Sequence, residues 1–143
     1  MLKLSKKVDY GLILLSRMRH QPEALSARQM AERYDLPVHM VANILKSLAA
    51  AGILTSTRGA QGGYELARTA NRISLADIVS ALEGPISLVD CAGAEAACRH
   101  SAYCPTHDPI QNVHRRFHAF MAGYTLDEII GAERGQPLQF QLG

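Results

Sequence analysis

Apolar residues recur at helical spacing through the first fifty positions of the chain. From Ser5 to His20, one side of a predicted helix is formed by Val8, Leu12, Leu15 and Met18. The pattern breaks at residues 21–24, and Ser26 then begins a second, short helix. The Ser26 hydroxyl is placed to cap the amides of the first turn while Gln29 reaches back, the pattern of a capping box.

A turn at Asp35 and Pro37 separates this short helix from a third, because proline disfavours a helical conformation in the residue before it. The third helix is predicted from Val38 to Ala51, with Gly52 as a suitable residue to end it. Its apolar side is expected to contain Val38, Val41, Ala42, Leu45, Leu48 and Ala49. Two helices joined by so short a turn predict a helix-turn-helix.

The polar side of the third helix carries His39, Asn43, Lys46 and Ser47 and contains no carboxylate. A helix face that is merely solvated normally mixes glutamate with lysine. A mildly basic, hydrogen-bonding face suits the major groove of DNA instead.

Two short strand-like runs follow, residues 53–57 and 64–67, around the glycine-rich segment 58–63. This pattern predicts a β-hairpin. A phosphate-binding loop is disfavoured, because such a loop opens a helix and ends in Gly-Lys-Ser/Thr. A hairpin after a helix-turn-helix is the wing of a winged helix, and Arg58, at the base of the wing, is expected to reach phosphate or the minor groove.

The second half of the chain predicts two further helices with a different segment between them. One begins at Ser74 and ends at Gly84-Pro85, with an apolar stripe of Leu75, Ile78, Val79 and Leu82. Residues 91–107 lack apolar periodicity and predict a loop. From Asp108 to about Ala122 the stripe returns as Ile110, Val113, Phe117, Phe120 and Met121, which can pack on the core of its own chain or on a second copy.

The predicted fold is therefore mostly α with a small β-hairpin wing. Residues 1–72 form the winged helix-turn-helix, 73–90 a linking helix, 91–107 a cysteine loop, 108–130 a dimerisation helix region and 131–143 a flexible tail. Thr125 with Glu128 predicts one short capped turn near the end of the fourth part.

Composition fits an ordinary globular protein of 143 residues, with 48% hydrophobic and 20% charged positions. No stretch approaches the ~18–20 apolar residues of a membrane span. Residues 1–10 lack the apolar run of a secretory signal, so we expect a cytoplasmic protein without a membrane partner. Charge is distributed unevenly along the chain. Residues 1–72 carry eleven basic and five acidic side chains, a net +6, whereas residues 73–143 carry four basic and eight acidic side chains, a net −4. The basic half predicts a polyanion partner.

The three cysteines, Cys91, Cys98 and Cys104, lie within fourteen residues, and His107 follows closely. An odd number of cysteines in a reducing compartment argues against a disulfide framework. Their gaps are wider than those of most zinc sites, and thiolates suit iron–sulfur clusters, in which imidazole can replace a thiolate. Inert cysteines and redox-only thiols are the alternatives.

The fourth ligand of such a cluster remains open between His107 and Asp9, which a dimer could bring from a second chain. Three further side chains, His100, Glu95 and Asp108, also lie within plausible reach.

These features together resemble the IscR- and NsrR-type bacterial winged-helix regulators of the Rrf2 family, which sense through an iron–sulfur cluster. The resemblance rests on four segments: residues 4–12, the wing at 58–67, residues 73–78 and the three-cysteine loop. Residues 83–88 are most similar to proteobacterial regulators of the SUF cluster-assembly operon.

The resemblance implies a homodimeric repressor that binds an imperfect palindrome in double-stranded DNA. Ligands would be Cys91, Cys98, Cys104 and His107 for a [2Fe-2S] cluster, whereas Asp9 goes with the [4Fe-4S] cluster of the nitric-oxide-sensing branch. Contacts to DNA are expected from Ser5, Lys6, Arg28, His39, Asn43, Lys46, Ser47, Arg58, Gln61 and Tyr64. Two departures from the family pattern are a first cysteine gap one residue longer than the common five, and Ala42 where IscR-type proteins carry a recognition glutamate.

Other functions are compatible with parts of the sequence. The cysteine loop could be a zinc staple or a bare thiol sensor, or the chain could be a cluster-binding protein-interaction module. An enzyme acting on a small-molecule substrate is disfavoured, because the sequence has no Ser/His/Asp ordering, nucleotide fingerprint or recognisable pair of carboxylates.

Overall fold

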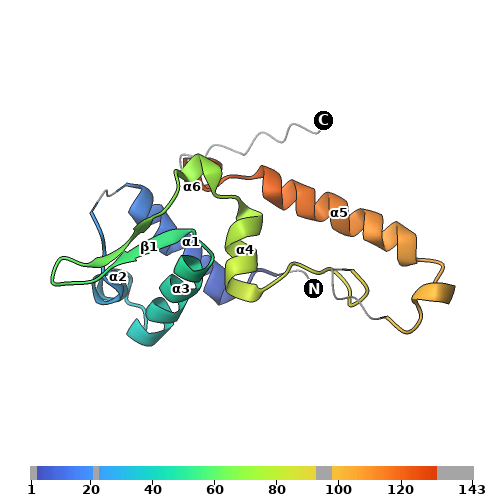
Figure 1. Ribbon diagram of the computed structural model, residues 1–143, viewed down its shortest axis with the longest axis horizontal. Coiled ribbons are helices and arrows are strands. Elements are labelled where there is room, and N and C mark those ends of the chain that lie inside the picture. Colours follow the sequence, from blue (N-terminus) through green and yellow to red (C-terminus); the bar gives the residue numbers. More distant parts are fainter. Residues whose placement is uncertain (1–2, 21–22, 93–97, 132–143) are drawn as a thin grey trace.

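The computed structural model describes residues 3–20, 23–92 and 98–131, which form helices and one antiparallel hairpin (Figure 1). This confirms the predicted fold class. The elements in chain order are α1 (Lys6–Arg19), α2 (Ala27–Tyr34), α3 (Val38–Ala50), β1 (Leu54–Thr57), β2 (Gly63–Leu66), the 3₁₀ turn η1 (Ala70–Arg72), α4 (Leu75–Glu83), the 3₁₀ turn η2 (Ser101–Tyr103), α5 (His107–Gly123) and α6 (Leu126–Gly131).

Side chains just outside the helices fix where two of them, α2 and α4, begin. The Ser26 hydroxyl accepts from the Gln29 amide at 3.2 Å, and the Gln29 side chain accepts from the Ser26 amide at 2.8 Å. This is the predicted capping box, and Ser74 with Asp77 forms a second one at the start of α4. Each box satisfies two amides that the first turn of a helix leaves unpaired.

The core lies where α1, α3 and α4 meet beneath the hairpin. Fully buried side chains include Val8, Leu14, Leu15, Val41, Ile44, Leu45, Leu48, Ile53, Ile73, Ile78 and Leu126. In α1, Leu14 is buried and Leu12 is only half-buried, so the buried face is rotated slightly from the predicted stripe. α3 packs against α2 on one side and against α1 and α4 on the other.

The prediction that Val38 belongs to the buried side of α3 is wrong, because this side chain is 48% exposed. Val38 is the first residue of the helix and lies one turn before the buried residues Val41, Ile44 and Leu45. At 100° per residue Val38 is near the middle of the predicted apolar side, but the residues that the structure buries, Val41, Ile44, Leu45 and Leu48, are centred to one side of it, so Val38 lies at the edge of the buried face.

The wing is a two-stranded hairpin in which Leu54 pairs with Leu66 and Thr57 with Gly63. A short bridge between Leu25 and Tyr64 attaches it to the segment before α2, with backbone bonds of 2.8 and 3.0 Å. Arg58 directly follows β1 and therefore lies in the loop at the tip of the hairpin. Its predicted position at the base of the wing is wrong.

Beyond α4 the chain extends away from this body and returns, forming an elongated arm (Figure 1). We use the name cysteine arm for the described residues of 84–123. The described residues of 84–106 run outward, and α5 runs back toward the body. At the body, Leu75 donates to the Tyr124 carbonyl at 2.8 Å and Leu126 donates to the Ile73 carbonyl at 2.7 Å, so the end of α5 is attached to the start of α4, whereas the arm leaves the other end of α4 at Gly84.

The apolar stripe of α5 has two different environments. Met121 is buried and Phe117 is half-buried, whereas Val113 and Phe120 are 52% and 50% exposed. Only the end of the stripe nearest the body therefore packs on the core of its own chain. The helix begins at His107, one residue before the predicted start, and the predicted tail at 132–143 lies outside the described residues.

Near the end of the described chain, α6 is held by the predicted Thr125–Glu128 cap and by an ion pair between Arg19 and Asp127 at 2.5 Å. Within the described ranges, no helix is long and apolar enough to cross a membrane.

Candidate functional site

The exposed face of α3 is polar along its length. His39, Asn43 and Lys46 are all exposed at spacings of four and three residues, so they form one row along the helix. Ser47 is half-buried beside this row. The predicted polar face is thus present, with Ser47 at its margin.

The N-terminus of α3 has no side-chain cap. Pro37 precedes the helix, and the first turn carries no acidic residue. The first amides of the helix and the positive end of its dipole therefore remain directed outward, as is favourable beside an anion. This arrangement is compatible with phosphate groups near the start of the helix.

The wing presents Arg58 and Gln61 at its exposed tip. Tyr64 differs from these two, because its ring is half-buried against the core and its backbone forms the bridge to Leu25. The structure thus gives Tyr64 a role in attaching the wing, in addition to the predicted contact with DNA.

Two of the three remaining predicted DNA contacts, Ser5 and Arg28, have partners within the chain. The Ser5 hydroxyl donates to a carboxylate oxygen of Glu83 at 2.5 Å and also accepts from the Val8 amide. Arg28 lies 3.6 Å from Glu32, and both side chains are largely exposed, so this ion pair is weak and easily exchanged. Lys6 is exposed at the start of α1.

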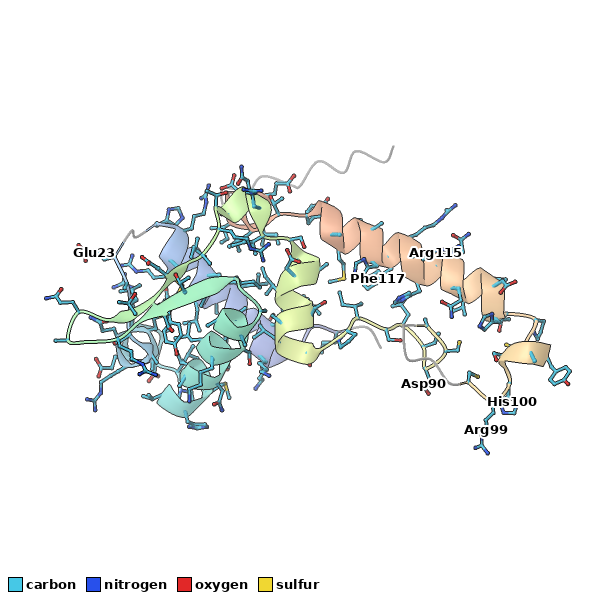
Figure 2. All side chains as sticks on the ribbon, in the orientation of Figure 1. Glu23, Asp90, Arg99, His100, Arg115 and Phe117 are labelled. Atoms are coloured by element: carbon cyan, nitrogen blue, oxygen red, sulfur yellow. The ribbon has the colours of Figure 1, made fainter. Side chains whose placement is uncertain are left out.

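The three cysteines lie along the arm, and none forms a disulfide. Cys91 is on the outward segment, and its carbonyl accepts from the Gln111 side chain of α5. Cys98 precedes the η2 turn, Cys104 follows it, and all three are half-buried. Arg99 and His100 mark the outer end of the arm in Figure 2.

In the part of the chain that the structure describes, no three His, Cys, Asp or Glu side chains are close enough to hold a metal ion. Residues 93–97, which include the candidate Glu95, lie outside that part. The chemistry of the donors nevertheless fits an iron–sulfur cluster, since three thiols and an imidazole on one arm are the ligand types such clusters use. The predicted site is therefore chemically suitable and is not assembled among the described residues.

Cys104 has the clearest electrostatic signature on the arm. Its sulfur lies 3.2 Å from the Thr106 hydroxyl. Hydrogen bonds from the Thr106 side chain, then from the Thr106 and His107 amides, lower the pKa of the Cys104 thiol below its ordinary value. Donors directed at sulfur favour the thiolate, which is the form that binds metals and reacts.

The two rival fourth ligands lie in different surroundings. The Nδ1 atom of His107 lies 2.9 Å from a carboxylate oxygen of Asp108. If Nδ1 donates this bond, Nε2 carries the lone pair, the tautomer that carboxylate partners support in metal-binding histidines. Asp9 is exposed in the first turn of α1, on the body rather than on the arm.

An apolar groove of about 460 Å³ lies where the arm joins the body. Its walls come from the start of α1, from α4, from the 85–87 segment and from α5, and include Leu4, Val79, Ile86, Phe117 and Phe120. Figure 2 shows Phe117 on the side of α5 that faces the outward segment. The exposed side chains of Leu4 and Phe120 line this groove and leave apolar surface uncovered.

Comparison with known sequences identifies the class of protein. A sequence model of the Rrf2 family, described as an iron-dependent transcriptional regulator, matches residues 4–132. The chain belongs to the Rrf2 family. Two HTH-type transcriptional regulators of Neisseria meningitidis, from serogroups A and B, are each 34% identical over 113 residues, which is 79% of this chain and 76% of theirs.

Solved structures of Rrf2-type regulators have the same fold. CymR, the global cysteine regulator of B. subtilis, superposes with a TM-score of 0.69 at 28% identity, over 92% of this chain and 98% of CymR. IscR of T. potens superposes with a TM-score of 0.67 at 28% identity, over 97% and 94%. The chain is thus a winged-helix, DNA-binding regulator of a family of transcription factors rather than enzymes.

Sequence reasoning missed several contacts at this site. Thr106 beside Cys104 and Glu83 beside Ser5 were not predicted, and neither was the bond from Lys7 Nζ to the Leu82 carbonyl at 2.8 Å. The proximity of Thr106 to Cys104 along the chain is a signal that could have been used. The other two contacts span more than seventy residues and have no local signature.

Proposed function

We propose that this Rrf2 regulator is a homodimeric repressor whose affinity for DNA responds to an iron–sulfur cluster on the cysteine arm. The ligands would be Cys91, Cys98, Cys104 and His107, and the cluster a [2Fe-2S] centre. Its targets would be SUF-type iron–sulfur assembly genes, as the resemblance at residues 83–88 implies, and its place of action the cytoplasm. The carrying observation is that one arm bears all three thiols and is anchored at both ends to the helix that contacts α3.

The DNA interface of this proposal consists of α3 in the major groove and the tip of the wing against the backbone. The exposed row His39, Asn43 and Lys46 supplies donors and acceptors for base edges, and Arg58 and Gln61 extend the surface beyond the helix. Both parts belong to the half of the chain with a net charge of +6. In a dimer, two such surfaces would bind the half-sites of an imperfect palindrome.

Binding to duplexes over a range of salt concentrations tests this interface. Removing one basic side chain of this interface, as in Lys46→Ala or Arg58→Ala, is expected to weaken binding. Arg58→Ala, which removes a phosphate contact, should also reduce the salt slope by about 1. Arg115→Ala is the matched control, because it removes an exposed arginine from α5. Unchanged affinity and slope in both test variants would show that DNA binds elsewhere.

The cluster, when bound, would supply a centre whose occupancy or oxidation state changes. The residues of the chain would hold it through three thiolates and the Nε2 atom of His107. The Thr106 hydroxyl and the two amides that favour the Cys104 thiolate would assist ligand deprotonation. The bond between Asp108 and Nδ1 would orient the His107 ring.

Anaerobic purification, followed by counting iron and sulfide per chain, tests the cluster. About two of each are expected for a [2Fe-2S] centre. His107→Ala should lower cluster retention, whereas the control variant His118→Ala, which removes an exposed histidine of the same arm, should not. Zinc alone, or no metal after reconstitution with iron and sulfide, would refute the cluster.

The alternative within this proposal is the nitric-oxide-sensing type with about four irons and Asp9 of a second copy as ligand. Asp9→Asn then lowers cluster retention and His107→Ala does not. The pair of variants therefore separates the two ligand sets without relying on the iron count alone.

A second copy of the chain would cover the exposed part of α5 and the neighbouring groove. Val113 and Phe120 are about half exposed, and the groove beside them is lined mainly by apolar side chains. Burial of such surface favours association. In sedimentation experiments, Phe120→Glu is expected to shift the protein toward monomer, and Ile13→Glu, exposed on α1 outside the groove, is the control. A monomeric wild type would refute the dimer.

A second candidate function is thiol-based sensing without a metal. It is favoured by the lowered pKa of the Cys104 thiol and by the likeness to CymR, a global cysteine regulator. CymR of S. aureus, which is 24% identical to this chain, has been crystallised in an oxidized form. Metal-free wild type that loses DNA binding on mild oxidation, while the Cys104→Ser variant keeps it, would favour this candidate over the cluster.

A further inference from the structure

Six large apolar side chains of the described residues are exposed, and one of them lies on α3, the recognition helix of the proposed DNA interface. Leu4 and Phe120 line the groove, Val113 lies on α5, Tyr103 beside Cys104, and Ile13 on α1. The sixth is Val38, the first residue of α3, with 48% of its surface exposed.

Val38 lies beside the polar row of the helix rather than within the core. At 100° per residue it is one turn before Ala42, which is itself half-buried, and it directly precedes the exposed His39. Val38 and Ala42 therefore form a narrow apolar strip along the edge of the row His39, Asn43 and Lys46. The strip contains no hydrogen-bonding side chain.

An apolar strip has one specific partner on the edges of base pairs in the major groove. Thymine carries a C5-methyl group there, and the other three bases present only hydrogen-bonding atoms or C–H at the corresponding positions. In helix-turn-helix proteins, the N-terminal residues of the recognition helix contact base edges. Val38 occupies that part of α3, and it has two methyl groups and no polar atom that would need a partner.

We propose that Val38 is a specificity-determining residue that reads a thymine methyl group, with Ala42 completing the apolar contact. This inference rests on the proposed DNA interface of α3. It predicts an A·T pair in each half-site, oriented so that the thymine methyl faces the start of the helix. Cytosine at that position is disfavoured, because its C5 carries a hydrogen in place of the methyl group and its N4 amino group would face a side chain that has no acceptor.

Uracil substitution isolates the contact, because it removes the methyl group and leaves every hydrogen-bonding atom of the base pair in place. A duplex is first selected from a random-sequence pool by the wild-type protein. Each of its thymines is then replaced singly by uracil, and dissociation constants are measured by fluorescence anisotropy at one salt concentration. The proteins compared are the wild type, Val38→Ala and the control Ile13→Ala, which shortens an apolar side chain of similar exposure outside α3.

For the wild type, uracil at one thymine per half-site is expected to weaken binding about fourfold, the value for loss of one buried methyl group. In Val38→Ala the same replacement should have little further effect, whereas Ile13→Ala should retain the full loss. Circular dichroism should show an unchanged fold, because Val38 is exposed and alanine favours helix.

Two results overturn the inference and leave the proposed function intact. One is a selected duplex in which no thymine is sensitive to uracil. The other is a sensitive thymine whose loss is the same in Val38→Ala as in the wild type. If the wild type selects no sequence from the pool, the proposed function fails first, so the two failures are distinguishable.

Discussion

The turn between α2 and α3 contains a residue whose replacement should stabilise the protein. Asp35 ends α2 with φ 52° and ψ 48°, and it is the only non-glycine residue with positive φ in the described ranges. A side chain in this left-handed conformation costs roughly 1–2 kcal/mol, although aspartate is among the residues that tolerate it best. Its carboxylate also lies at the negative end of the α2 dipole.

The expected effect of Asp35→Gly follows from three contributions. Removing Cβ recovers about 1 kcal/mol or slightly more, and removing the charge from the helix end recovers roughly 0.3–1 kcal/mol. The greater freedom of glycine in the unfolded chain costs about 0.5–1 kcal/mol. The backbone bond from the Asp35 amide to the Ala31 carbonyl is retained. The net expectation is a stabilisation of about 1 kcal/mol.

At the other end of α3, replacing Gly52 by alanine is the reverse change, because it adds a Cβ to a residue with positive φ. Gly52 follows α3 with φ 74°, and a Cβ added there would meet no atom within 4 Å. Gly52→Ala should therefore destabilise through the backbone alone, by about 1 kcal/mol. The two changes in the free energy of unfolding should add in the double variant, because the sites share no partner, and since their signs are opposite they should nearly cancel.

Urea unfolding followed by circular dichroism measures both variants at one protein concentration, since oligomerisation would otherwise shift the midpoint. The m-value should remain constant while the midpoint rises for Asp35→Gly and falls for Gly52→Ala. If Gly52→Ala destabilises but Asp35→Gly does so too, then Asp35 makes a favourable interaction in its present conformation, and the strain argument fails at this turn.

Three further predictions concern α6, the cysteine arm and the wing. Hydrogen bonds from the Thr125 amide and then from the Thr125 hydroxyl lower the pKa of Glu128. This carboxylate therefore stabilises the fold above its unfolded pKa, and the stabilisation is lost as pH falls through the lower folded pKa. Glu128→Gln should be less stable than wild type at neutral pH, and the urea midpoints of the two proteins should converge in acid. In metal-free protein, Thr106→Val should raise the pKa of the Cys104 thiol, shifting the pH profile of alkylation by iodoacetamide upward, and an unchanged profile would contradict the assigned hydrogen bond. A Cβ at Gly63 would lie 2.5–2.9 Å from backbone atoms of Leu25, so Gly63→Ala should detach the wing from the segment before α2. We expect DNA binding to weaken severalfold while the helix content, measured by circular dichroism, stays unchanged.

Local chemistry made the helix boundaries predictable from the sequence. The Ser26 and Ser74 caps, the Gly52 terminus and the hairpin around residues 58–62 all depend on residues within four positions of one another. Interactions of that range are set by backbone geometry and by the nearest side chains. The same reasoning found the polar row of α3, because exposure on one side follows directly from burial on the other.

Coverage of an apolar face was not predictable in the same way. Periodicity identified the stripes of α3 and α5, but Val38 and Val113 on those stripes are exposed. Whether a stripe is buried depends on how far a neighbouring element extends, which is decided by contacts remote in sequence. The position of Cys91 along the arm, and its carbonyl's bond to Gln111, depend likewise on the return of the chain through α5.

The same long-range contacts limit how the cysteine arm can affect the recognition helix. At its C-terminal end, α4 is held by the first turn of α1, through the Ser5–Glu83 and Lys7–Leu82 bonds, immediately before the arm begins at Gly84. α4 in turn packs directly on α3. A change in the arm can therefore move α3 within one copy only by displacing α4, which requires these two bonds to break. A change in how two copies contact each other through α5 requires neither, because the exposed stripe lies beyond the anchored residues. For the proposed dimer, the fold thus favours a mechanism in which the arm would alter the spacing of the two winged helices rather than the shape of either one.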